Sequence, residues 1–247
     1  MEKNELLRRM EDLCERAERS GTVCSSGYLS PAERYQTEKW AKQRGCTVVF
    51  SGGGADCERT AAFFLPEYMS EEYFDPSEHF AAIKLTAHFG TPGHRDYMGA
   101  LLGMGVGREW VGDIRVMGDT AYIFCLPSVH RHLLSIDKVG RCGVTAENIA
   151  PGDVPQAKRE VKEKSFSVMS MRLDAVTAGM FDLSRTEAAR EIRLGNVSLN
   201  YEQCEKPDAQ ISAGDIISLR GAGKGSVTGT GGTSRKGRLF VYAELLK

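Results

Sequence analysis

The sequence lacks the cysteine and histidine spacings that bind metal ions or build a disulfide framework. Its seven cysteines include no pair separated by two residues, and an odd number does not suit a secreted disulfide scaffold. His130 and His132 lie two positions apart on an expected helix, so their side chains point to different sides and do not share a metal ion. We therefore expect neither a metal site nor a cofactor.

Long apolar runs and a targeting signal are also missing. No apolar segment approaches the roughly 20 residues of a membrane-spanning helix. Residues 1–21 read MEKNELLRRMEDLCERAERSG, which is the pattern of a charged amphipathic helix and not of a signal peptide. We expect a cytoplasmic protein that has no membrane partner.

The sequence has no recognisable phosphate-binding loop. Residues 52–54 are three glycines that follow an expected strand at 47–50, a place where backbone amides can hold a phosphate. However, the run has neither the GxGxxG spacing nor a following GK[ST]. A tight turn is the better interpretation, and we expect a helix to begin after it.

Net charge is small but unevenly distributed. The chain has 247 residues, a formal charge of −1 and 41% hydrophobic residues, enough for two or three small domains with cores of their own. Such a chain does not coat nucleic acid by bulk charge. From Ser165 onward, however, there are 11 basic and 9 acidic residues, against 21 and 24 before it. This asymmetry gives mild support to a local nucleic-acid site in the last third.

The last third is predicted to contain two short helices followed by a small sheet. Leu173, Val176 and Met180 recur at helical spacing. Ser184 and Glu187 form a capping-box pattern for a second helix that runs to residue 194, where Gly195 suits a left-handed end. Short strands are expected at 197–199, ending at Asn200, and at 216–219, ending at Arg220.

Arginines occupy the outer arc of the second helix. Ala188 and Ile192 share its apolar side, and Arg185 and Arg193 lie roughly 80° apart on the helical wheel. Both could face one RNA backbone, and we expect their joint exchange for Glu to leave the fold intact. A helix with one apolar and one basic face can rest on a core and present cations to phosphates. Surface arginines are also ordinary, so charge alone leaves both interpretations open.

Upstream, the order of elements predicts an α+β protein of three domains. The middle part is expected to contain strand 80–87, helix 94–104, strands 113–117 and 120–126, helix 128–135 and strand 143–149. This β-α-β-β-α-β order is typical of a split βαβ sandwich, the topology of RRM domains, although the strands carry no RNP1-type aromatic sequence. We expect an N-terminal α/β domain at 1–72, an RRM-like domain at 73–155 ending in a linker at 151–155, and a C-terminal domain at 156–247 that begins with an extra strand at 159–169.

Several spaced elements of the last third resemble the S-four RNA-binding domain. They are RLD at 172–174, SR..A at 184–188, G.V..N at 195–200 and GD.IS.RG at 214–221. The resemblance implies a C-terminal domain with a core at 171–224 that binds structured RNA. It departs from the family at Glu187 and Glu191, and in a glycine-rich segment at 221–237 that is expected to be a flexible loop carrying Lys224, Arg235 and Lys236. The residues expected to contact RNA are Arg172, Arg185, Arg190, Arg193, Asn200, Arg220 and Lys224.

The upstream parts resemble the YlmH family. Three short motifs carry part of this likeness: FSGGG at 50–54, CER at 57–59 and FDP at 74–76. The part most specific to the family is HRDYMGALLGMG at 94–105, followed by Arg108 and GDI at 112–114. The family implies an N-terminal domain, an RRM-like domain and a C-terminal S-four domain. It also implies binding of rRNA and tRNA on the large ribosomal subunit carrying peptidyl-tRNA, in rescue of stalled translation. Arg95 and Arg108 are candidates for a second RNA surface, and no DNA binding is expected.

Two other functions remain open from the sequence. One is an RNA-modifying enzyme, because pseudouridine synthases use an Asp in a motif like RLD. Here that motif opens the binding domain itself, and signatures of tyrosyl-tRNA synthetase (HIGH, KMSKS) and of a methyltransferase cofactor loop are missing. The other is an interaction module in cell division, with which the family has been linked. We expect a non-enzymatic RNA-binding protein.

Overall fold

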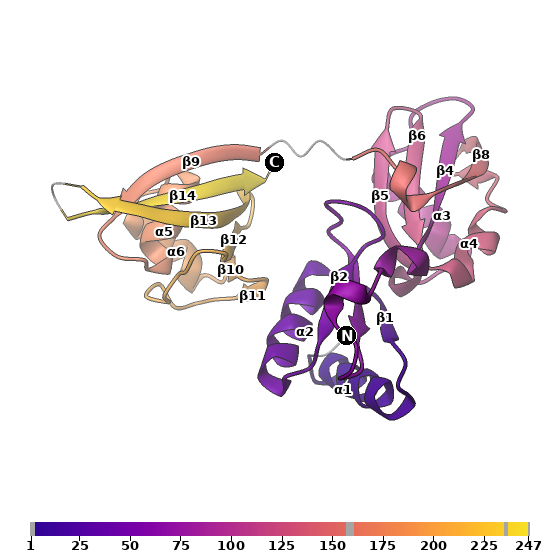
Figure 1. Cartoon of the computed structure of the whole chain (residues 1–247). Helices are drawn as coiled ribbons and strands as arrows, with labels where there is room; N and C mark the ends of the chain where they lie inside the picture. Colours follow the sequence, from indigo (N-terminus) through magenta and orange to yellow (C-terminus); the bar gives the residue numbers. More distant parts are fainter. Residues whose placement is uncertain (1–2, 157–160, 235–236, 247) are drawn as a thin grey trace. The chain divides into compact units, whose positions relative to one another are not determined.

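The computed structural model describes residues 3–156, 161–234 and 237–246. It is a mixed α+β structure (Figure 1) whose contacts divide the chain into a first unit, Met1–Ala157, and a second unit, Lys158–Lys247. Within the described residues, no helix combines the length and apolarity needed to cross a membrane.

The first unit begins with a three-stranded sheet covered by two helices. The strand order is β1 (Cys24–Leu29), β3 (Thr60–Phe64), β2 (Val48–Ser51), all antiparallel. Helix α1 (Lys3–Ser20) buries Leu6, Met10 and Leu13 against this sheet together with α2 (Pro31–Arg44). The capping box expected from the sequence is present, since Ser30 and Glu33 exchange hydrogen bonds at the start of α2.

The second layer of the first unit is a five-stranded antiparallel sheet. Its order is β5 (Val111–Met117), β6 (Thr120–Cys125), β4 (Ala81–Ala87), β8 (Cys142–Ile149) and β7 (Lys138–Val139). Helices α3 (His94–Gly103) and α4 (Pro127–Leu133) contribute Tyr97, Leu101 and Leu133 to the core on one face. Every strand and helix predicted between 80 and 149 is observed, with ends shifted by one or two residues, and the two-residue strand β7 is an addition that was not predicted.

Aromatic side chains join the two sheets of the first unit. One buried cluster contains three phenylalanine rings: Phe63 of β3, Phe80 directly before β4, and Phe124 of β6. The rings of Phe63 and Phe80 meet edge to face with centroids 5.7 Å apart. The opposite face of the five-stranded sheet is therefore partly covered by the N-terminal sheet. An RRM domain stacks bases on that face, and here the N-terminal sheet occupies part of it.

The segment after β2 is not the predicted helical start. The glycines 52–54 lead through a loop into strand β3. A Cβ on Gly54 would lie 2.6 Å from the Phe124 ring, and one on Gly52 would lie 2.3 Å from the Cβ of Cys57. The run is glycine because the backbone is packed against neighbouring atoms, which supports the tight turn over a phosphate loop.

Segment 151–155 is packed and is not the linker that the sequence suggested. It forms a short 3-10 turn at Pro151–Asp153, and Val154 is buried. The carbonyl oxygen of Pro155 accepts a 2.9 Å hydrogen bond from the buried guanidinium of Arg115. The same guanidinium stacks over the Phe124 ring at 5.0 Å and donates to the carbonyl of Ala55. Arg115 therefore ties this segment to the first unit.

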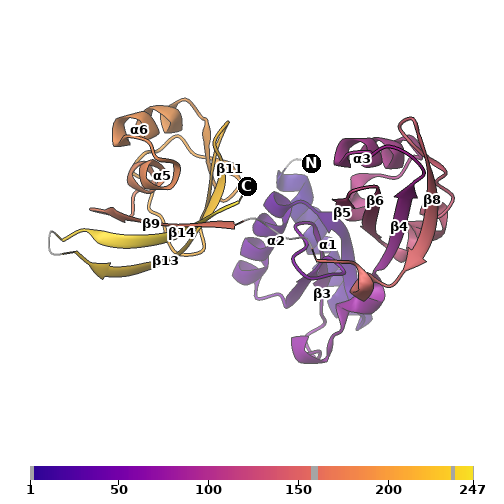
Figure 2. The same ribbon diagram turned by 90° about the horizontal axis from the view of Figure 1, so that it is seen from above.

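The described part of the second unit contains a six-stranded antiparallel sheet, and helices α5 (Leu173–Phe181) and α6 (Arg185–Arg193) lie on one face of it (Figure 2). The predicted residues Leu173, Val176, Met180, Ala188 and Ile192 are all buried. Its strand order is β11 (Glu202–Gln203), β10 (Val197–Leu199), β12 (Ile216–Leu219), β13 (Gly223–Thr233), β14 (Leu239–Leu246) and β9 (Val161–Val168).

The glycine-rich segment is a strand for most of its length, so the prediction of a flexible loop was wrong. β13 pairs with β12 on one side and β14 on the other. Gly229 lies opposite Tyr242, and a Cβ on Gly231 would lie 2.8 Å from the Tyr242 hydroxyl. The Tyr242 ring therefore covers the part of β13 where Gly229 and Gly231 carry no side chain. Arg235 and Lys236 lie outside the described residues, as do positions 159 and 160 of the extra strand.

Candidate nucleic-acid interface

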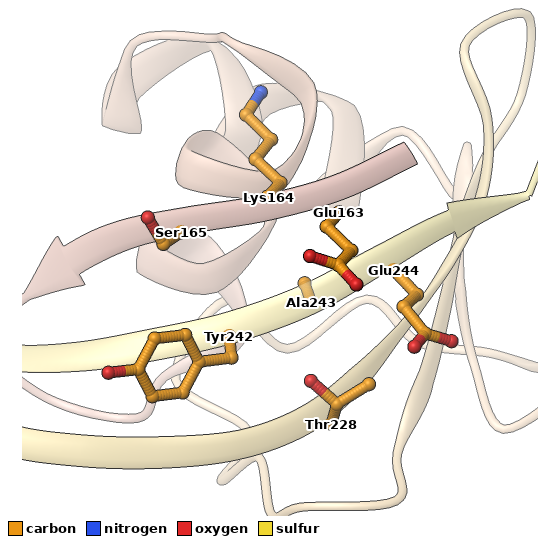
Figure 3. Close-up of a pocket in the computed structure, with 7 residues that line it drawn as sticks. All are labelled: Glu163, Lys164, Ser165, Thr228, Tyr242, Ala243 and Glu244. Atoms are coloured by element: carbon orange, nitrogen blue, oxygen red, sulfur yellow. The ribbon is translucent and has the colours of Figure 1, made fainter. Parts of the chain in front are cut away.

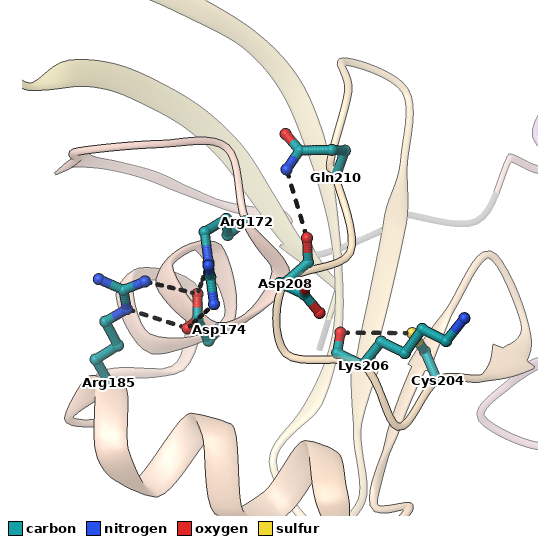
Figure 4. Close-up of polar contacts among 7 residues, drawn as sticks. All are labelled: Arg172, Asp174, Arg185, Cys204, Lys206, Asp208 and Gln210. Atoms are coloured by element: carbon teal, nitrogen blue, oxygen red, sulfur yellow. Dashed lines mark hydrogen bonds and ion pairs between the residues drawn. The ribbon is translucent and has the colours of Figure 1, made fainter.

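Two arginines of the second unit are held by one buried carboxylate (Figure 4). Asp174 is 5% exposed. Its oxygens accept hydrogen bonds from Nε and Nη2 of Arg172 at 3.2 and 3.1 Å, and from Nε and Nη2 of Arg185 at 3.1 and 3.3 Å. Both arginines use two nitrogens, the arrangement that best fixes the guanidinium plane. We call these three residues the Asp174 cluster.

Local structure explains how the Asp174 cluster is assembled. Arg172 is the residue that precedes α5, and its backbone bridges to Gln210 of the neighbouring loop. Arg185 is the first residue of α6, where the Ser184–Glu187 capping box fixes the start of the helix. Asp174 lies in the first turn of α5, where a negative charge is favourable to the helix dipole. Two helix starts therefore place two guanidinium groups on one carboxylate.

Electrostatics keeps Asp174 ionised. Burial alone would raise the pKa of this carboxyl, but the hydrogen bonds and charges of Arg172 and Arg185 outweigh it, so the pKa lies below its usual value of 3.8. The guanidinium side chains remain 36% and 54% exposed. Each keeps N–H groups that can reach a phosphate. The Asp174 cluster thus presents two oriented guanidinium groups, whose charges are partly neutralised by the one carboxylate between them.

Of the remaining arginines of α6, one is paired and one is not. Arg190 contacts Glu191 at 3.0 Å, and Glu191 also accepts a hydrogen bond from the Asn196 amide. Arg193 is exposed, and among the described residues its side chain makes no hydrogen bond or ion pair. Arg193 is accordingly the arginine of this helix whose charge is least compensated.

The strand residues of the predicted site lie in different environments. Asn200 has a structural position, because its amide donates to Asp215 at 2.7 Å and its oxygen accepts from the Ile216 amide. The backbone N–H of Arg220 bonds to Asn196, which brings this exposed arginine to the end of α6 that carries Arg193. Lys224 lies on β13 with its Nζ 5.8 Å from the centre of the Tyr201 ring.

The proposed second surface belongs to the first unit. Arg95 is exposed in the first turn of α3, near Asp96, which caps that helix by accepting from the Gly93 amide. Arg108 is exposed at the start of a 3-10 turn, and its carbonyl accepts a hydrogen bond from Arg59. Neither arginine belongs to the aromatic cluster that joins the sheets, so both are accessible from solvent.

A hollow in the second unit has two glutamates among its seven lining residues and does not suit phosphate (Figure 3). It has a volume of about 500 Å³ and lies over β9, β13 and β14. Glu163 and Glu244 face each other directly across the β9–β14 ladder. Lys164 turns to the helix side, where its Nζ contacts Asp182 at 2.6 Å. The two carboxylates therefore make this hollow unfavourable for a phosphate group.

The sequence predicted Arg172 and Arg185 as RNA contacts, and the structure brings their side chains together on Asp174, a residue that the prediction did not include. The signal for Asp174 was the RLD motif itself, in which an acidic residue lies two positions after an arginine. The structure also revises one expectation. Exchanging Arg185 for Glu would place a second carboxylate beside Asp174, so that exchange is not neutral for the fold.

Comparisons with known proteins agree with this architecture. Residues 72–152 match the family model described as "Putative RNA-binding domain in YlmH". Over 222 residues the chain is 30% identical to a Bacillus subtilis (strain 168) protein named "Ribosome-associated protein quality control protein P2", which spans 89% of this chain and 86% of that one. The solved structure "Cell division protein ylmH from Streptococcus pneumoniae" matches with a TM-score of 0.53 and 19% identity, covering 60% of this chain and 92% of that chain.

These likenesses define the class of the protein. The solved structure, at 19% identity, supports the fold alone. The relative from Bacillus subtilis is aligned over most of both chains, and the family model covers the five-stranded sheet of the first unit. The chain belongs to the YlmH family.

Proposed function

We propose that this protein binds structured RNA of the ribosome and acts there as a non-enzymatic adaptor. The observation that carries the proposal is the Asp174 cluster, in which two helix starts of the second unit present oriented guanidinium groups. Arg193 and Arg220 add exposed charge at the other end of α6. Contacts of this kind position a protein on phosphates, and the shape of the RNA supplies specificity.

The comparisons support an RNA partner in a ribosomal setting. The model matching residues 72–152 describes an RNA-binding domain, and the similar Bacillus subtilis protein is named as ribosome-associated and as a quality control protein. In our proposal the second unit is an S-four-type domain and residues 73–155 an RRM-like domain. The target is rRNA and tRNA on a large subunit that carries peptidyl-tRNA, in rescue of stalled translation.

Both units are proposed to contact RNA, but with different parts of their surfaces. In the second unit the helix side carries the arginines, while the hollow over β9, β13 and β14 carries two glutamates. In the first unit, the sheet face that an RRM domain would use is partly packed. In the proposal, the exposed side chains of Arg95 and Arg108 are the RNA contacts of that unit.

Sedimentation with isolated large subunits tests the proposal. The full chain should co-sediment more strongly with subunits that carry peptidyl-tRNA than with empty ones, and raising the salt should release it. Fragments 1–157 and 158–247, which follow the boundary between the units, then separate the two surfaces. If fragment 158–247 binds no structured RNA while fragment 1–157 does, the role proposed for the Asp174 cluster is wrong. A modification of rRNA or tRNA that is lost without the protein and restored by purified protein would overturn the non-enzymatic role.

A further inference from the structure

Two thiols of the first unit lie in direct contact across the helical layer. The Sγ atoms of Cys14 and Cys46 are 2.7 Å apart, only about 0.7 Å more than the length of a disulfide bond. Cys14 lies in the fourth turn of α1, and Cys46 follows Gly45, which ends α2 in a left-handed conformation. The two residues are 32 positions apart in the chain, so their contact is a product of the fold.

The surrounding structure fixes both sulfur atoms in this position. Buried Met10 and Leu13 hold α1 on the sheet, and Arg44 of α2 pairs with Glu11 of α1. The amide of Cys46 donates to the Ala41 carbonyl at 3.1 Å. The sulfur atoms need to approach each other by only about 0.7 Å to bond. Both cysteines are only half-buried, so a small oxidant can reach them.

We propose that Cys14 and Cys46 are an oxidative modification site, at which a peroxide forms a reversible disulfide that links α1 to the end of α2. In the first step, the Cys46 thiol is oxidised by hydrogen peroxide to a sulfenic acid and one water is released. In the second step, the sulfur of Cys14 attacks the Cys46 sulfur, the S–O bond breaks, and the Cys14 proton leaves with the hydroxide as a second water. Two thiols and one peroxide thus give one disulfide and two waters.

We assign the first oxidation to Cys46 and the second step to Cys14. Burial and the hydrogen bond with Cys46 raise the pKa of Cys14 to about 12, so this residue stays a thiol at neutral pH, and thiols react with oxidants much more slowly than thiolates. The link itself rests on the contact between the two sulfur atoms and does not depend on which of them is oxidised first.

The other described cysteines of the first unit have different neighbours. The sulfur of Cys24 accepts from Arg16, that of Cys57 from Arg115, and Cys125 is buried with its pKa raised to about 12 by burial. Cys142 is half-buried, and among the described residues its sulfur makes no hydrogen bond with another thiol. These four residues serve as internal controls for the selectivity of oxidation.

Peptide mapping of the full chain after mild peroxide treatment tests the proposal. Of seven thiols in the reduced protein, two should be lost together and restored by dithiothreitol, which leaves five after oxidation. Trypsin keeps Cys46 and Cys57 in one peptide, residues 45–59, so fragment spectra must assign the link to Cys46. The oxidised chain should also melt roughly 5–10 °C higher, since the link closes a loop of about 30 residues.

Matched variants sharpen the test. C14S should lose the link and leave Cys46 as a sulfenic acid that dimedone labels, whereas C142S should form the link as the natural chain does. Overturning results are an unchanged thiol count, a dominant link at another pair, or a link between two chains on a denaturing gel. Mapping of the natural chain decides the matter even if C14S fails to fold.

Discussion

Asp174 and Arg185 form a two-bond ion pair across the turn that joins α5 to α6, with nitrogen–oxygen distances of 3.1 and 3.3 Å. Arg172 approaches the same carboxylate from the start of α5. One acidic side chain therefore couples the stability of the helical pair to the orientation of the two arginines that we assign to RNA. Stability and binding can be separated by experiment, because they respond differently to pH, to salt and to the position of the substitution.

The first prediction concerns acid. The folded-state pKa of Asp174 lies below 3.8, so its contribution to stability is fully present above the unfolded-state pKa and is lost as the pH falls through the folded-state pKa. D174N should lower the free energy of unfolding of the second unit at pH 7 by about 1–3 kcal/mol, because two half-exposed arginines lose their partner. The difference from the natural chain should shrink below pH 4, as followed by urea unfolding with circular dichroism.

Asp208 supplies the control for that experiment. It is an exposed carboxylate in the loop next to the cluster (Figure 4). D208N should change the free energy of unfolding by less than about 0.5 kcal/mol. Equal effects of the two substitutions at pH 7 would show that Asp174 does not hold the cluster together.

The second prediction concerns Arg193. R193E reverses an exposed charge without removing a contact from the core, so the circular dichroism spectrum should not change. Affinity for ribosomal RNA should fall several-fold at low salt, and the slope of log affinity against log salt should decrease by about 1, the value for one phosphate contact. R9E, on the exposed side of α1, makes the same charge change elsewhere. A similar loss with R9E would mean that only net charge matters.

The third prediction distinguishes the core of α6 from its surface. Ile192 is fully buried, whereas Leu194, two residues later, is 64% exposed. I192D places an unpaired charge in the core and should destabilise the second unit by more than about 3 kcal/mol. L194D should lower the free energy of unfolding of the second unit by less than about 1 kcal/mol. The midpoints of thermal unfolding of the two variants measure this contrast, and equal midpoints would contradict the observed orientation of the helix.

The fourth prediction concerns the glycines of the first unit. G54A would push a methyl group to 2.6 Å from the Phe124 ring, and overpacking of this kind costs about 1–3 kcal/mol. G99A is the matched control, because a Cβ on Gly99 in α3 meets nothing within 4 Å. Alanine favours a helix over glycine by up to about 1 kcal/mol, so G99A should raise the melting temperature while G54A lowers it. An unchanged melting temperature of the G54A variant would show that the turn at residues 52–54 can open to accept a methyl group.

Local signals in the sequence predicted much of the fold. The capping boxes at Ser30 and Ser184 have fixed spacing, and both are observed as hydrogen bonds. The order of strands and helices from 80 to 149 was also recognisable, because each element has its own periodicity. Strand β3 was missed since TAAFF at 60–64 is buried on both faces, and a run without alternation looks the same in a strand and in a helix.

Features that depend on distant neighbours could not be predicted. β13 contains few apolar residues, and it is a strand because β12 and β14 supply hydrogen bonds on both sides. Asp174 meets Arg185 across 11 positions, a contact that needs the folded turn between α5 and α6. The RNA-binding roles of the arginines in the second unit stay a prediction, as do the domain boundaries at 72 and 155.

The packing of Gly54 beneath Phe124 has a consequence for the history of the family. The space for a ring at one position exists only because a side chain is missing at the other. A lineage that acquires a side chain at position 54 must replace the ring at position 124 with something smaller, or lose the stability of the joined sheets. The two positions should therefore covary across relatives, although 70 residues separate them in the chain.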